Sequence, residues 1–227
     1  MTGALSQPQN LTSRQRWFSL AEFVGGAAIV IAHNVYRIIP NEVPILFVLG
    51  WISVRLRDGG WKKVGLHKPD SWWKTIFWAV LAGILVIAAG QLAEIVGAKI
   101  WGHPAVGPSV IKEAKNTWKS ALFALGVVWT FAAFGEEMGY RGYLMTRAAD
   151  AGNRSRLAYL AALLASSVLF GFGHYYKGAP GILQSTVSGL ILGGAYLLSG
   201  RNLWVPILAH GSADTIVILA VLLGWAD

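Results

Sequence analysis

The sequence predicts an all-α protein, a polytopic transmembrane helix bundle of about seven spans. Hydrophobic residues make up 55% of the 227-residue chain and charged residues only 13%, which is far from the composition of soluble domains. The apolar stretches also lie too close together to leave room for a soluble domain between them. Finally, the chain has 11 tryptophans, which are typical anchors at membrane interfaces. We therefore predict a single membrane domain of six to eight spans.

Seven apolar stretches, bounded by charged residues or by proline and glycine, support this number. Most of them approach the roughly 20 residues that a transmembrane helix needs. The second, at about 14 residues, is either a short tilted span or a re-entrant segment, and the fourth is long enough to begin as an interfacial helix. The predicted spans are residues 17–37, 43–56, 74–97, 119–147, 157–176, 180–199 and 203–224.

These spans form one predicted domain, residues 17–224, after a polar cytoplasmic tail at residues 1–16. Lysine and arginine are more frequent in the loops on the side of this tail than in the opposite loops, which favours a cytoplasmic N-terminus. The net charge of +8 then reflects topology and contact with anionic lipid headgroups, so we expect no nucleic-acid partner. The absence of cysteine excludes disulfides and thiolate catalysis.

The stretch FGEEMGYRGY, residues 134–143, places three ionisable side chains in the fourth predicted span. An ionised side chain in hydrocarbon costs about 2.5–3.5 kcal/mol, so these groups must be paired, hydrated or functional. Glu137 and Arg141 are one helical turn apart with the acid first, and we expect them to form an ion pair. Glu136 lies about 100° around the helix from Glu137 and needs a partner elsewhere.

Two later spans offer such partners at helical spacing. The fifth has Phe170 and His174 one turn apart, and the seventh has His210 and Asp214 one turn apart. A buried carboxylate such as Glu136 can take a proton from water, while imidazoles can hold the water, a metal ion or an oxyanion. Small residues beside these groups would let the helices approach closely: Gly171, Gly173, Gly211 and Ser212.

Helical rise gives a rough test of whether these groups can meet. Counting about 1.5 Å per residue from the predicted cytoplasmic ends puts Glu136 and Asp214 at similar depths, with His210 nearby. His174 comes out about one and a half turns further along. Only helix tilt or a different helix start would bring it to the others.

Three motifs in this order carry a resemblance: Glu-Glu-x-x-x-Arg at 136–141, Phe-x-x-x-His at 170–174 and His-x-x-x-Asp at 210–214. They resemble the CPBP family of intramembrane proteases, also called the CAAX protease and bacteriocin-processing family. The resemblance covers roughly residues 115–220 and implies a multi-helix membrane endopeptidase, a glutamic or metallo-endopeptidase.

The same resemblance implies roles for individual residues. Glu136 would act as general base on a water molecule that His174 helps to position, while His210 with residue 214 would stabilise the oxyanion. Asparagine is usual at position 214 in members that process prenylated proteins, and a carboxylate cannot donate a hydrogen bond unless protonated. Asp214 is therefore expected to orient His210 or to bind a metal ion. The residues expected to support the site are Glu137, Arg141 and Phe170.

A metal ion is one of two alternatives for the predicted chemistry. Two histidines with one or two carboxylates could hold Zn²⁺ or another divalent ion and leave an open position. The candidate ligands are then Glu136, His174, His210 and Asp214. A mechanism without metal, dependent on the glutamate alone, is the other alternative, because both have been put forward for the family that the motifs resemble.

These patterns predict an endopeptidase that cleaves a membrane-associated peptide or protein in a prokaryotic cytoplasmic membrane. A catalytically silent immunity or scaffold protein is an alternative, and Glu136→Ala would leave the activity of such a protein intact. A proton-coupled transporter is another, with Glu136, His174 and Asp214 as a relay, although paired broken helices are not evident. His33 and Asn34 interrupt the first span near its outer end, and we expect an interfacial role for them.

Overall fold

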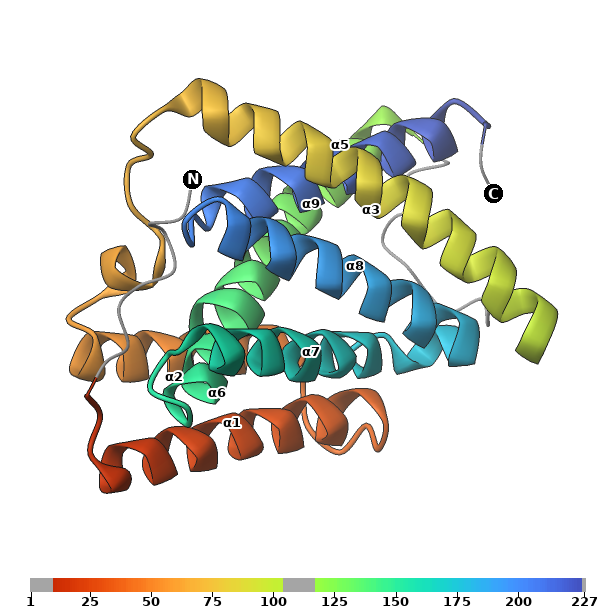
Figure 1. Ribbon diagram of the computed structural model, residues 1–227. Coiled ribbons are helices and arrows are strands. Elements are labelled where there is room, and N and C mark those ends of the chain that lie inside the picture. The colour runs from red at the N-terminus through yellow and green to blue at the C-terminus, as the bar shows by residue number, and fades with distance from the viewer. Residues whose placement is uncertain (1–9, 104–116, 226–227) are drawn as a thin grey trace.

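The computed structural model describes residues 10–103 and 117–225, and every regular element in these two ranges is helical (Figure 1). The all-α prediction is thereby confirmed. The long elements are α1 (Ser13–Asn34), α2 (Glu42–Arg57), α3 (Trp72–Trp101), α5 (Trp118–Val127), η2 (Val128–Leu144), α6 (Met145–Asp150), α7 (Arg156–Phe172), α8 (Gly178–Leu198) and α9 (Trp204–Leu222). Two short 3₁₀ turns lie in the connections, η1 (Trp61–Val64) and η3 (Tyr175–Lys177).

Each of the seven predicted apolar stretches coincides with a helix, and α5, η2 and α6 form one continuous helix, Trp118–Asp150. By length and composition, four helices of the described ranges could cross a membrane, and Arg156–Phe172 is apolar but shorter. The four are Trp72–Trp101, Trp118–Asp150, Tyr175–Leu198 and Trp204–Leu222. The chain is thus a helical membrane bundle, as predicted.

The first helix begins four residues before the predicted start at residue 17, because a capping box precedes it. The Thr12 side chain accepts a hydrogen bond from the Gln15 N–H, and the Gln15 side chain accepts one from the Thr12 N–H. Part of the predicted tail at residues 1–16 is therefore helical. Residues 1–9 of that tail lie outside the described residues.

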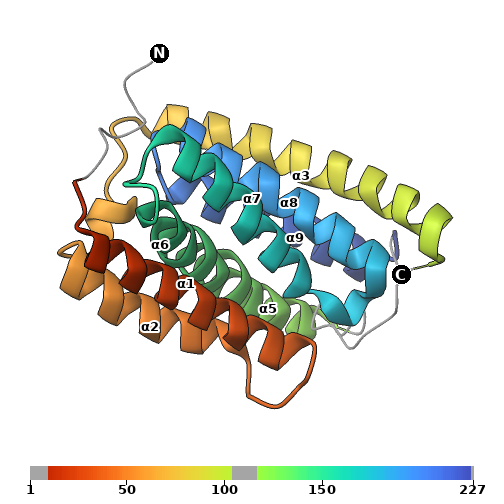
Figure 2. The same ribbon diagram turned by 60° about the horizontal axis from the view of Figure 1, so that its bottom comes forward.

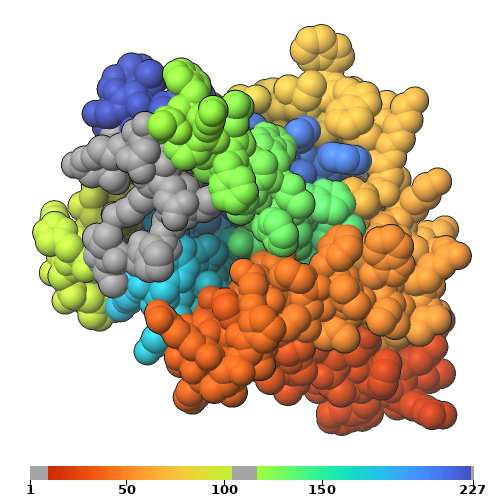
Figure 3. All heavy atoms as spheres, turned by 180° about the vertical axis from the view of Figure 1, so that it is seen from behind, coloured from red at the N-terminus to blue at the C-terminus, as the bar shows by residue number. Residues whose placement is uncertain are grey.

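The helix Trp118–Asp150 crosses the bundle obliquely and organises the packing (green in Figures 1 and 2). Its η2 part packs against α2 and α9, and its α6 part packs against α1 and α7. On the other side of the bundle, α8 packs against both α3 and α7, and α3 also packs against α9. Seen from behind, green side chains of this helix lie at the surface beside those of α2 in orange (Figure 3).

Small residues allow the closest of these helix contacts. A Cβ atom on Gly135 of η2 would lie 2.7 Å from Val43 Cγ1 of α2, and one on Gly171 of α7 would lie 2.0 Å from Thr186 Oγ1 of α8. Hydrogen is therefore the only side chain that fits at these crossings. The contacts fix the relative positions of the helices that carry the motifs.

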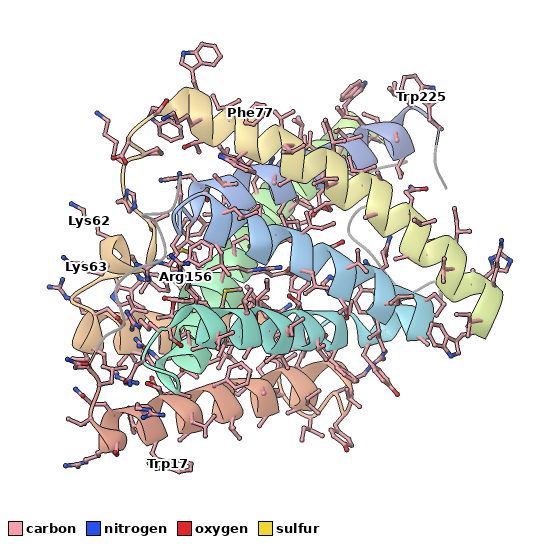
Figure 4. The ribbon with its side chains drawn as sticks, in the orientation of Figure 1. Trp17, Lys62, Lys63, Phe77, Arg156 and Trp225 are labelled. Carbon is pink, nitrogen blue, oxygen red and sulfur yellow. The ribbon has the colours of Figure 1, made fainter. Side chains whose placement is uncertain are left out.

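One end of the bundle holds a buried cluster of ion pairs that the sequence patterns did not reveal. Arg147 is fully buried and pairs with Asp58 and with Asp150, its Nη1 lying 2.9 Å from Asp150 Oδ2. Arg154 Nη2 lies 2.6 Å from Asp58 Oδ1, and Arg57 pairs with Glu22. These pairs join α1, α2 and the end of α6. Exposed cations lie at the same end of the bundle, including the labelled Lys62, Lys63 and Arg156 (Figure 4).

Candidate active site

The segment that carries the two glutamates is π-helical, with i→i−5 backbone hydrogen bonds such as that from the Met145 N–H to the Tyr140 carbonyl. Its turns are wider than the 3.6-residue turn assumed from the sequence, and π-helical turns occur frequently at functional sites. The predicted ion pair is nevertheless confirmed, since Arg141 Nη1 lies 2.9 Å from Glu137 Oε1. Both side chains are buried, whereas Glu136 is only partly buried.

A cavity of about 480 Å³ brings the predicted catalytic residues to one place. Glu136 of η2, His174 of the α7–α8 turn, and His210 and Asp214 of α9 all line it. The Oε2 atom of Glu136 is buried and has no hydrogen-bond partner within the described ranges. This carboxylate therefore has an acceptor atom available for a water molecule or a substrate group.

His210 is held by a hydrogen bond from its Nδ1 to Glu137 Oε1, at 2.9 Å. A carboxylate oxygen is the acceptor, so Nδ1 carries the hydrogen and the ring orientation is fixed. The Nε2 atom lies 3.6 Å from Asp214 Oδ2, which is too long for a hydrogen bond. The expectation that Asp214 orients His210 is thus replaced by a role for Glu137, whose Oε1 accepts from both Arg141 and His210.

His174 lies two residues after the end of α7, and its ring turns back to the helix end. Its Nδ1 donates to the Phe170 carbonyl at 3.0 Å, which leaves Nε2 for the cavity. In the neutral ring, this hydrogen bond places the acceptor lone pair on Nε2. The depth mismatch expected for His174 does not separate it from Glu136, because the helix that carries Glu136 is oblique and the cavity extends to the α7–α8 turn.

Phe170 forms the aromatic wall behind both histidines. Its ring centroid lies 4.9 Å from that of His174 and 6.1 Å from that of His210. On its other sides it meets the Tyr140 ring edge-on at 5.1 Å and the Arg141 guanidinium at 4.5 Å. Phe170 therefore packs against the groups that hold the site together, as expected from its position in the motif.

The residues that line the cavity but were not assigned to the site from the sequence include a polar group on α1 and α2. This group comprises His33 and Asn34 at the end of α1, and Glu42 at the start of α2. The signal for the first two was present, because they interrupt an otherwise apolar span. Glu42 gave no such signal, since it lies at a predicted span boundary.

The predicted metal ligands are not grouped around one point in this arrangement. Within residues 10–103 and 117–225, no three His, Cys, Asp or Glu side chains are grouped so that they could hold one. The Nδ1 atoms of His174 and His210 are both engaged in hydrogen bonds within the protein, which leaves their Nε2 atoms for the cavity. The four predicted ligands thus line one cavity without converging on a common point.

Comparison with known families agrees with the motifs. Residues 117–216 match the family described as "Type II CAAX prenyl endopeptidase Rce1-like", and this segment contains all three motifs. Neither the curated proteins nor the solved structures give a match. Residues 117–216 are thus similar to the CAAX protease family that the motifs resemble.

Proposed function

We propose that this protein is an intramembrane endopeptidase that hydrolyses a peptide bond in a membrane-associated peptide or protein. One observation carries the proposal. Glu136, with an unpartnered carboxylate oxygen, lines the same cavity as two histidines whose Nδ1 atoms are fixed by hydrogen bonds. A general base, a water site and an oxyanion donor are the parts that amide hydrolysis requires.

In the proposed reaction, Glu136 takes a proton from a water molecule whose oxygen attacks the scissile carbonyl. The neutral His174 accepts a hydrogen bond from this water at Nε2 and so positions it. His210 donates its Nδ1–H to Glu137. The ring lies between the carboxylates of Glu137 and Asp214, which together favour a second proton on Nε2. This Nε2–H is the donor to the oxyanion. No step requires a metal ion.

We further propose that the N-terminus lies on the cytoplasmic side of a prokaryotic membrane. Exposed Lys62, Lys63 and Arg156 gather at the end of the bundle where α1 begins, and cations favour the cytoplasmic side (Figure 4). The chain has no cysteine, so Lys63→Cys would introduce a single reactive thiol. A membrane-impermeant maleimide should label it only in opened cells. Labelling of intact cells would show that the N-terminus lies on the opposite side.

Turnover by the purified protein tests the proposed activity. In liposomes it should cleave a fluorogenic membrane-associated peptide. Cleavage should be abolished in each of three variants, Glu136→Gln, His174→Ala and His210→Ala, while a cooperative thermal unfolding transition shows that each is still folded. Glu94→Gln is the matched control, because Glu94 is a carboxylate of α3 that accepts from Gln184 and does not line the catalytic cavity. Full activity in Glu136→Gln would refute the assignment of the base.

A further inference from the structure

The cavity wall formed by α1 and α2 carries a second carboxylate with its own partners. Glu42 is only 6% exposed, and its Oε1 accepts a hydrogen bond from Asn34 Nδ2 at 2.9 Å. Its Oε2 lies 3.4 Å from His33 Nε2. All three residues lie outside the segment that matches the protease family. A buried acid in a membrane bundle points to a functional role by default.

The contact between His33 and Glu42 offers a place for a proton. His33 Nδ1 lies 3.0 Å from the Ile39 carbonyl, which can only accept, so Nδ1 carries a hydrogen. If Nε2 and Glu42 were both unprotonated, a lone pair would face a carboxylate oxygen at 3.4 Å. A proton on Nε2 or on Glu42 Oε2 removes this unfavourable contact. The His33 side chain is 29% exposed, so this proton can be exchanged with the surroundings.

The His33–Glu42 pair is also close to the proposed base. Gly135 and Val43, the chain neighbours of Glu136 and Glu42, are in direct contact, since a Cβ on Gly135 would lie 2.7 Å from Val43 Cγ1. Glu136 and Glu42 both line the cavity. The other titratable side chains that line it are His174, Tyr176, Lys177, His210 and Asp214. A substrate in the cavity would thus have the base and the pair along the same walls.

We propose that the His33–Glu42 pair supplies the proton that the leaving amine takes up, a step that rests on the proposed function. A water O–H bond breaks, its proton goes to Glu136, and the water oxygen bonds to the carbonyl carbon. The C–N bond then breaks while the amine nitrogen takes the proton shared by His33 and Glu42. Cavity water returns the proton held by Glu136 to the pair, which restores the starting state.

The dependence of the rate on the leaving group tests this role. An amine cannot leave without a proton, whereas a p-nitrophenolate can. Glu42→Gln should therefore lower kcat for the fluorogenic peptide at least about 100-fold, the lower end of the usual contribution of a general acid. Hydrolysis of the matching peptide p-nitrophenyl ester should change little. That ester activity also reports that the variant is folded.

Two further variants separate the possible outcomes. Glu136→Gln should abolish cleavage of both substrates, and if it does not, the proposed function fails rather than this inference. Glu94→Gln should leave both rates unchanged. An equal loss on peptide and ester in Glu42→Gln, or no loss on the peptide, would overturn the proton-donor role. If Glu42→Gln does not fold, His33→Gln removes one of the two groups that hold the proton and must show the same selective loss on the peptide.

Discussion

Replacement of Arg141 by methionine tests the buried charge network under the site. Arg141 is 1% exposed and contacts three groups: Glu137 Oε1 at 2.9 Å, the Gly189 carbonyl at 3.3 Å and the Phe170 ring at 4.5 Å. Methionine keeps much of the side-chain volume but none of these polar contacts. The fully buried Glu137 would then lose the one partner with a permanent charge that it has among the described residues.

The expected loss of stability follows from this geometry. Removal of one partner from a buried ion pair costs about 3–5 kcal/mol. Glu137 keeps the hydrogen bond from His210 Nδ1, so we expect the lower part of that range, about 3–4 kcal/mol. For a chain of this size, each kcal/mol shifts the midpoint of thermal unfolding by about 2–4 °C. Arg141→Met should thus unfold about 6–16 °C below the wild type.

Tryptophan fluorescence during heating in detergent measures this shift. Arg156→Met is the matched control, because Arg156 is exposed at the start of α7, and its midpoint should stay close to that of the wild type. The double variant Glu137→Gln/Arg141→Met should regain part of the loss, since no carboxylate is then left unpaired. A shift in Arg141→Met no larger than in the control would refute the reasoning.

Two other predictions concern packing and cofactor use. Gly171→Ala would place a methyl group 2.0 Å from Thr186 Oγ1 and should lower the free energy of unfolding by about 1–3 kcal/mol. Gly194→Ala should cost little, because no atom lies within 4 Å of the added methyl group. Equal unfolding midpoints for the two variants would contradict the α7–α8 contact. Chelation should leave peptide cleavage unchanged, because the described donor atoms do not group around an ion, and activity lost to chelator and restored by Zn²⁺ would contradict this expectation.

The helices were predictable because apolar length alone decides which segments enter a membrane. Their ends were less so, because caps and turns decide them. Thr12 starts α1 before the apolar residues begin, and the π-helical turns of η2 leave no clear trace in the pattern. The η2 segment packs against α2 and α9, and a single sequence does not show such contacts between helices.

The site was predictable where its residues share a helix and not where they meet across the bundle. Glu137 and Arg141 are one helical turn apart, so their ion pair could be predicted from the spacing in the sequence. The hydrogen bond between His210 and Glu137 joins residues 73 positions apart, and the His33–Glu42 pair belongs to helices outside the family match. Only the three-dimensional arrangement brings these groups to the cavity.

Hydrolysis in ¹⁸O-labelled water, followed by mass spectrometry of the peptide products, tests the central role of Glu136 most directly. With the wild type in liposomes, the new carboxyl terminus should carry one oxygen from the solvent. Glu136→Gln, which leaves the Glu137–Arg141–His210 contacts in place, should give no cleaved product. Labelled product from Glu136→Gln at the wild-type rate would show that another group activates the water.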